Sequence, residues 1–113
     1  MEFYTPRKLK FKAWDKESKL LMRLNSIECV KGELVKKNHV LLQFTEMTDQ
    51  HGEELYEMDI ILWGSNKYVI VWSDSPAGWY LLDMKNSQYR EALTQQQAAT
   101  FLRLGSYFEL EKP

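Results

Sequence analysis

Residues 55–84 contain, in succession, LYEMDIILW, GSN, KYVIVW, SDSPAG and WYLLDM, and this stretch decides the fold class. Three runs rich in Ile, Val, Leu and aromatic residues are separated by two short segments that contain Gly, Ser, Asn, Asp and Pro. Such runs between turn residues predict β-strands. We therefore expect strands at residues 55–63, 67–72 and 79–84, with the apolar run 60–63 buried on both faces.

The residues before this stretch continue the β pattern. Residues 8–13, KLKFKA, alternate lysines with apolar side chains, which is typical of a half-buried strand. A polar turn at 15–19 and a return strand at 20–30, interrupted near Asn25 and Ser26, follow. A further strand is expected at 39–44 and a loop at 45–54, while residues 34–38 fit more than one structure. Regular spacing of strands and turns favours a small barrel or sandwich.

The period of the apolar residues changes near the C-terminus. Thr94 and Gln97 form a capping-box pattern, and apolar residues follow it at helical spacing. We predict a short helix over residues 95–103, stopped by Gly105, and an edge strand over 106–110.

Length and composition point to one domain without covalent staples. The chain has 113 residues, 44% hydrophobic residues and a single cysteine, which excludes an intrachain disulfide. Cys29 is expected to be buried, as free cysteines usually are. No segment resembles a signal peptide and no apolar run reaches the roughly 18 residues that span a bilayer. These features predict a cytoplasmic protein that does not enter a membrane.

Charges are segregated along the chain. Residues 1–25 carry seven basic and three acidic side chains, whereas residues 38–66 contain no Lys or Arg and six acidic residues. The basic and acidic segments should attract each other, either within one subunit or between neighbouring subunits. Aromatic side chains would add apolar burial to an assembly, and Trp14, at the end of the basic strand, is the tryptophan least committed to the core.

The acidic segment offers the main candidate for catalysis. Asp49, Glu53, Glu57 and Asp59 could together hold Mg²⁺ or Mn²⁺ for a hydrolytic reaction. Their spacing matches no metal-binding motif, and Asp49 has a turn role. The two histidines and Cys29 lack catalytic spacing as well. We therefore expect no metal, no cofactor and no enzymatic activity.

The basic strand offers a candidate for nucleic-acid binding. Lys8, Lys10 and Lys12 would project from one face at intervals of about 6.6–6.8 Å, near the spacing of phosphates. Lysines on an edge strand also guard against aggregation, and the slightly acidic net charge of −1 disfavours binding to a polyanion. Nucleic-acid binding is therefore kept as an alternative.

Three stretches resemble one family of small proteins. Residues 10–15, KFKAWD, are similar to its K-F-R-A-W-D signature, and residues 43–61 to its pattern Y-T-G-L-x-D-x-x-G-x-x-I-Y-E-G-D-I-V. Residues 104–110, LGSYFEL, are similar to its closing I-G-N-I-Y-E-N. The chain thus resembles the YopX family, which is encoded mainly by phages and prophages. The resemblance implies a small SH3-like barrel and a phage origin, but no activity and no catalytic residue.

Two positions depart from the family pattern. Glu46 and Met58 stand where the family usually has Gly. Either the local turns are ordinary here, or neighbouring contacts offset the strain of a positive φ, roughly 1 kcal/mol or more.

Together these observations predict a mainly β protein: a small SH3-like barrel with an N-terminal β-hairpin extension and one short C-terminal helix. We expect a single domain over residues 1–113, with an N-terminal β subregion at 1–45 and the barrel at 46–113. The preferred function is a non-catalytic phage accessory module, located in the bacterial host cytoplasm, that binds a protein partner or self-associates as a homo-oligomer. The alternatives are a nucleic-acid-binding barrel and a metal-dependent hydrolase at residues 46–59. The candidate interaction surface comprises Lys8, Lys10, Lys12, Trp14, Asp49, Glu53, Glu57 and Asp59.

Overall fold

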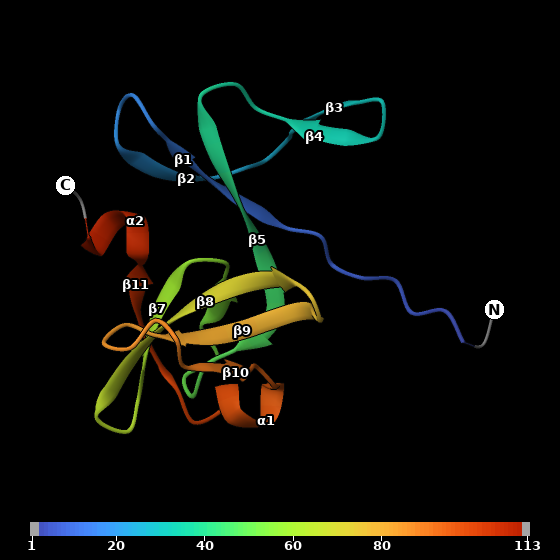
Figure 1. The fold of residues 1–113 in the computed structure, drawn as a ribbon. Coiled ribbons are helices and arrows are strands. Elements are labelled where there is room, and N and C mark those ends of the chain that lie inside the picture. The colour runs from blue at the N-terminus through green and yellow to red at the C-terminus, as the bar shows by residue number, and fades with distance from the viewer. Residues whose placement is uncertain (1–2, 112–113) are drawn as a thin grey trace.

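The computed structural model describes residues 3–111, which form a mainly β fold with two short helices (Figure 1). The strands are β1 (Phe11–Asp15), β2 (Leu20–Arg23), β3 (Glu28–Val30), β4 (Glu33–Val35), β5 (His39–Thr48), β6 (Glu54–Tyr56), β7 (Asp59–Trp63), β8 (Asn66–Asp74), β9 (Ala77–Asp83), β10 (Arg90–Ala92) and β11 (Leu102–Ser106). The helices are α1 (Gln95–Ala98) and α2 (Tyr107–Leu110). Neither is long or apolar enough to cross a membrane.

Strand β5 joins the two main parts of the molecule. It pairs with β1 through its first half and with β6 through its second half, in a sheet of order β2-β1-β5-β6. In Figure 1 it runs from the β1–β2 hairpin down into the lower part of the fold. The strand therefore crosses residue 45, where the sequence suggested a boundary between subregions.

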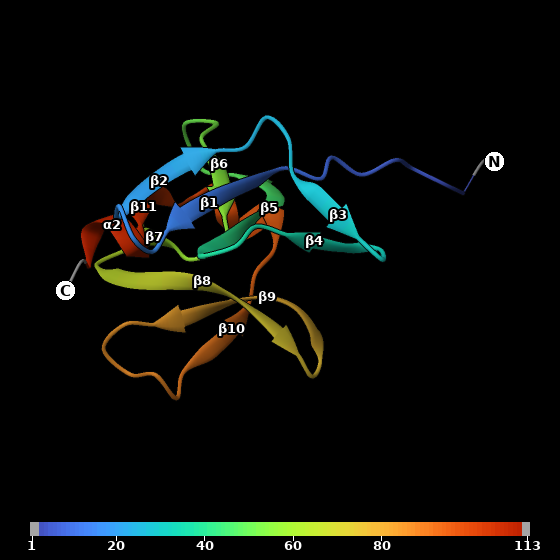
Figure 2. The same cartoon turned by 90° about the horizontal axis from the view of Figure 1, so that it is seen from above.

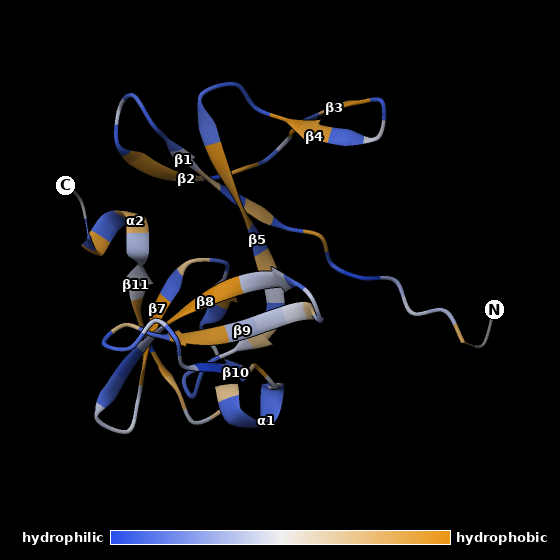
Figure 3. Cartoon of the chain, viewed as in Figure 1, coloured by the Kyte–Doolittle hydropathy of each residue, from blue (hydrophilic) through white to orange (hydrophobic). Residues whose placement is uncertain are grey.

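The second sheet has the order β10-β9-β8-β7-β11 and is entirely antiparallel. It curls into a half-barrel that packs against β5 and β6, as predicted for a small β fold. The hydropathy colouring of Figure 3 shows apolar residues along β8 and β9. The core consists of Leu55, Ile61, Tyr68, Ile70, Leu81, Leu93, Ala98 and Phe101.

The strand expected over residues 55–63 is in fact two strands, β6 and β7, so this prediction was wrong. The break falls at the Glu57–Met58 turn, where the backbone N–H of Met58 donates to the carbonyl of Ile70 at 2.7 Å. The carboxylate of Asp59 accepts from the backbone N–H of Tyr56 at 2.8 Å and so closes the turn. A side-chain acceptor thus interrupts an otherwise continuous apolar pattern.

The C-terminal prediction was partly wrong. The capping box between Thr94 and Gln97 is confirmed, but the helix ends at Ala98 rather than at residue 103. Residues 102–106 form β11 against β7, and this pairing overrides the helical spacing of the apolar residues. The predicted edge strand at 106–110 is instead α2, a second short helix that Ser106 caps.

The N-terminal half differs from the prediction in three respects. Strand β1 begins at Phe11, so Lys8 and Lys10 precede it and only Lys12 lies within it. Strand β5 continues to Thr48, so the following loop covers only residues 49–53. Cys29 is exposed, because the β3–β4 hairpin that carries it does not pack into the core.

Two arms project from the same side of the molecule, as Figures 1 and 2 show. One arm is the β3–β4 hairpin, whose turn residues Lys31 and Gly32 have φ of 51° and 83°, as in a type I′ turn. The other is the extended segment 3–10, all of it exposed. The radius of gyration is 14.8 Å, whereas a compact chain of this length has roughly 13 Å.

Candidate functional site

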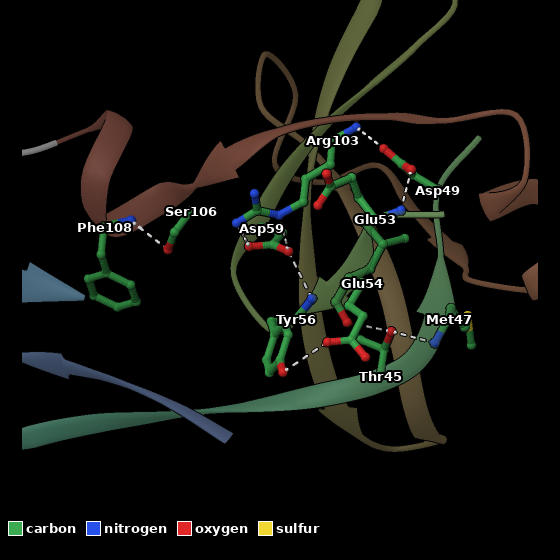
Figure 4. A network of polar contacts seen from close by, with 11 residues as sticks. Thr45, Met47, Asp49, Glu53, Glu54, Tyr56, Asp59, Arg103, Ser106 and Phe108 are labelled. Atoms are coloured by element: carbon green, nitrogen blue, oxygen red, sulfur yellow. Dashed lines mark hydrogen bonds and ion pairs between the residues drawn. The ribbon is translucent and has the colours of Figure 1, made fainter. Parts of the chain in front are cut away.

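A polar network lies where β7 and β11 pair, and it includes three of the predicted site residues, Asp49, Glu53 and Asp59 (Figure 4). The guanidinium of Arg103 donates from Nε to Oδ2 of Asp59 at 2.8 Å and from Nη2 to Oδ1 at 3.2 Å. Asp59 is only 1% exposed, and its Oδ2 also accepts from the backbone N–H of Tyr56 at 2.8 Å. The pair therefore fixes β11, β7 and the turn between β6 and β7 to one another.

Burial acts in opposite directions on the two members of this pair. It raises the pKa of the Asp59 carboxyl, against the lowering contributions of Arg103 and the Tyr56 N–H. Burial would lower the pKa of Arg103, but the hydrogen bonds and charge of Asp59 outweigh it and raise that pKa. Arg103 thus stays charged, and either partner alone would be a costly buried group.

Asp49 has a structural role that goes beyond the turn predicted for it. Its Oδ1 accepts from the backbone N–H groups of His51 and Glu53, at 2.8 and 2.9 Å, and its Oδ2 accepts from that of Arg103 at 2.8 Å. Burial tends to raise the pKa of Asp49, but these three N–H donors outweigh it and the pKa is lowered. Asp49 therefore ties the 49–53 loop to β11 as an ionised acceptor.

The four candidate carboxylates do not converge. Asp49 and Asp59 are buried and both accept from Arg103, Asp49 from its backbone N–H and Asp59 from its guanidinium, whereas Glu53 is exposed and Glu57 lies in the turn after β6. Among residues 3–111 no three His, Cys, Asp or Glu side chains gather as a metal ion would require. The convergence on which the hydrolase alternative depends is therefore missing from the described part of the chain.

The predicted lysine ridge is not an exposed row. Lys10 forms an ion pair with Glu54, and its Nζ lies 4.8 Å from the centre of the Phe44 ring. Lys12 is partly buried, with its Nζ 4.3 Å from the centre of the Tyr56 ring. Burial, followed by the nearby charge of Arg103, lowers the pKa of Lys12. Lys8 and Lys10 are exposed and precede β1, and Lys10 is held by its ion pair with Glu54.

The opposite charges of the two segments meet within one chain in two ion pairs. Besides the Lys10–Glu54 pair, Arg7 Nε lies 3.1 Å from Glu46 Oε1. Both pairs join the basic N-terminal segment to the acidic middle segment, and the lysine ion pair lowers the pKa of Glu54. Attraction inside the subunit, one of the two arrangements that the sequence allowed, is therefore present in the structure.

The tryptophans divide into buried and exposed residues. Trp14 is only 5% exposed and stacks on Phe108 of α2, with ring centres 5.6 Å apart. The expectation that it is the least committed to the core was wrong, because α2, which the sequence did not predict, covers it. Trp72 is 46% exposed and meets Trp79 edge to face at 5.0 Å.

Both positions that lack the family's glycine adopt the glycine-like conformation. Glu46 has φ 69° and Met58 has φ 67°. Glu46 lies in a bulge of β5, where the Thr45 hydroxyl donates to the Leu55 carbonyl at 2.8 Å and accepts from the Met47 N–H at 3.1 Å. Neighbouring contacts therefore offset the strain at these positions, which is the second of the two explanations offered by the sequence.

Arg103 is the central residue that the sequence did not reveal. It falls in a segment that was expected to be helical. No sequence pattern therefore indicated that Arg103, on β11, would bind Asp59 on the neighbouring strand β7. The signal that could have found it is the need of a buried Asp for a cation, because the 38–66 segment supplies none.

Comparison with known proteins agrees with this architecture. The model of the YopX protein family matches residues 2–109. The chain belongs to the YopX family. A solved structure, protein EF1440 from Enterococcus faecalis, superposes with a TM-score of 0.67 at 18% identity, covering 93% of this chain and 96% of that one. At this identity the likeness concerns the fold alone. Curated proteins gave no match.

Proposed function

We propose that this YopX-family chain is a non-catalytic protein-interaction module, a phage or prophage accessory protein that binds a second copy of itself through its two N-terminal arms. The observation that carries the proposal is the exposure of apolar side chains on the β3–β4 hairpin and on the 3–10 segment, which contacts the rest of the fold through Arg7 and Lys10. These side chains are Phe3, Tyr4, Leu9, Val30, Leu34 and Val35. Several exposed apolar side chains on projecting segments favour an interaction site.

The β3–β4 arm is poorly stabilised on its own. Each strand has three residues, every one of them exposed, and the pair forms a separate two-stranded sheet. An isolated two-stranded hairpin is marginal in water, and its outer edges present unpaired backbone groups to another strand. Pairing with a further strand would stabilise this arm.

A second copy suits the β4 edge because the edge is complementary to itself in charge. Residues 33–37 read ELVKK, acidic at the start and basic at the end. β4 itself ends at Val35, and Lys36 and Lys37 follow it in the turn to β5. An antiparallel approach about a two-fold axis through Val35 therefore brings Glu33 of one copy near this turn and its Lys37 in the other, twice in each interface. Stable interfaces bury at least roughly 1,200 Å², so the second arm, with Phe3 and Tyr4, is needed to add area.

Charge reversal tests this arrangement by sedimentation of the full chain. Glu33→Lys should weaken association about tenfold, because it brings like charges together at both ends of the pairing. Adding Lys37→Glu to that variant should restore association by reversing both charges. Glu17→Lys is the matched control, since Glu17 is exposed in the distant β1–β2 turn. Equal weakening by the control, or no recovery in the double variant, would contradict the proposed geometry.

The rival functions gain no specific support from the fold. Nucleic-acid binding by the lysine ridge would require Lys10 and Lys12 to leave the contacts that they make with Glu54 and with the Tyr56 ring. The predicted lack of enzymatic activity and the predicted cytoplasmic location both stay predictions.

A further inference from the structure

A cavity of about 340 Å³ lies between β5, the β6–β7 turn and the paired strands β8 and β9. Its lining residues are Arg7, Gln43, Glu57, Trp72 and Trp79. The cavity is lined by elements that belong to the packed part of the fold, apart from Arg7 on the 3–10 arm. A ligand could therefore bind in this cavity whether or not the arms associate with a second copy.

Two indoles form one wall of this cavity and are held in place. Trp72 and Trp79 are directly opposite each other in the β8–β9 pairing, with ring centres 5.0 Å apart and planes at 74°. The Nε1–H of Trp72 donates to Oδ1 of Asp74 at 2.8 Å, which fixes the ring although the residue is 46% exposed. A large apolar side chain that is ordered and yet exposed is typical of a binding surface.

Glu57 supplies a carboxylate without a cationic partner. Within residues 3–111 it forms no ion pair, and its one side-chain hydrogen bond comes from the Gln43 backbone N–H at 3.4 Å. Burial raises the pKa of Glu57, against that hydrogen bond. Its position is fixed on both sides, since its own N–H donates to the Gln43 carbonyl at 2.8 Å and that of Met58 donates to Ile70.

We infer that this cavity binds a small alkylammonium group between the wall formed by Trp72 and Trp79 and the carboxylate of Glu57. Aromatic faces attract alkylammonium ions through their quadrupole, and a partly desolvated carboxylate adds a direct charge. Arg7 stands at the rim with its Nε bound to Glu46, so it is a like charge that weakens the site.

The test is titration with tetramethylammonium chloride, followed by the NMR signals of the indole N–H groups. Saturable shifts confined to Trp72 and Trp79 are expected, while tert-butanol, a neutral probe of similar shape, and sodium chloride at equal ionic strength should leave them unchanged. Trp72→Ala and Glu57→Gln should each weaken binding about tenfold, and Arg7→Ala should strengthen it about twofold.

Matched controls separate this site from general binding. Tyr89→Ala removes an exposed aromatic residue elsewhere, and Glu28→Gln removes an exposed carboxylate on the hairpin; neither should change the affinity. If the Trp72→Ala variant does not fold, the titration is made with Trp72→Leu, which keeps an apolar side chain at this position but removes the indole. Equal shifts with tert-butanol, or undiminished binding by both Glu57→Gln and Trp72→Leu, would overturn the inference.

The source of the ammonium group follows from two further probes. Tighter binding of trimethyllysine amide than of choline would identify a modified side chain of a partner, and the reverse would identify a small metabolite. Binding of neither, with tetramethylammonium also inactive, would refute the site while leaving self-association untouched.

Discussion

The β3–β4 and β7–β8 hairpins have the same local design and opposite surroundings. Each closes with a two-residue turn that contains a glycine at positive φ, Gly32 at 83° and Gly64 at 65°. Strand β7 is buried at Asp59, Ile60 and Ile61, whereas every residue of β3 and β4 is exposed. Turn chemistry thus specifies a hairpin in both places, but only packing decides which of them contributes to the stability of the domain.

The largest effect is expected at the buried ion pair of the β7 side. Asp59→Ala would leave the partly buried guanidinium of Arg103 without its carboxylate and the Tyr56 N–H without its acceptor, and we expect a loss of about 3–5 kcal/mol in the free energy of unfolding. Urea denaturation measures it. The double variant Asp59→Leu with Arg103→Met should recover much of the loss, because no unpaired charge then remains. A loss below about 1 kcal/mol for Asp59→Ala would contradict the role assigned to the pair.

Equivalent truncations in the two hairpins test the comparison directly. Ile61→Ala in β7 should destabilise the monomer by about 2–5 kcal/mol, because Ile61 is fully buried in the core. Leu34→Ala in β4 should change it by less than about 0.5 kcal/mol. Thermal unfolding at low protein concentration measures both. Similar losses in the two variants would show that the arm packs against the monomer after all.

Acid sensitivity should depend on Asp49. Its folded-state pKa is lowered, so its contribution to stability is complete above the ordinary pKa of Asp and is lost as the pH falls through the folded-state value. In Asp49→Asn an amide replaces the carboxylate that accepts from three backbone N–H groups, and its NH2 group cannot accept a hydrogen bond. We expect the free energy of unfolding to fall by about 1–3 kcal/mol at pH 7. The variant should also show a flatter pH dependence below about pH 4. An unchanged acid profile would exclude Asp49 as the titrating group.

A smaller effect is expected at the strained bulge of β5. Glu46→Gly and Glu46→Ala both remove the ion pair with Arg7, but only Gly relieves the positive φ. The Gly variant should therefore be more stable than the Ala variant by about 1 kcal/mol, as chemical denaturation can measure. Equal stabilities would mean that residue 46 bears no backbone strain.

The sequence predicted elements whose signal is local. The strands around Gly64, the turn at residues 15–19 and the capping box at Thr94 all depend on neighbouring residues, and the structure has them. Long-range contacts account for the failures. The carboxylate of Asp59 accepts from the Tyr56 N–H and so ends the strand expected over 55–63. Arg103 lies in β11, which pairs with β7, rather than in the expected helix.

The candidate site was predictable only in part, for the same reason. The distribution of charges along the sequence indicated that the basic and acidic segments attract each other. It did not indicate that Lys10 would form its ion pair with Glu54. Cys29 was expected to be buried because free cysteines usually are, yet no other element covers its hairpin in the described chain. The sequence therefore predicts which charged segments attract each other, whereas the fold determines which side chains form ion pairs.

Sedimentation equilibrium of the full chain across a range of concentrations tests the central claim most directly. The proposed association through the β3–β4 arm predicts a mass that rises from 13.5 kDa toward twice that value. Val35→Asp, which places like charges on the proposed two-fold axis, should keep the protein at 13.5 kDa with unchanged stability of the monomer. A parent chain that stays at 13.5 kDa at the highest concentration, or a Val35→Asp variant that associates equally well, would contradict the account.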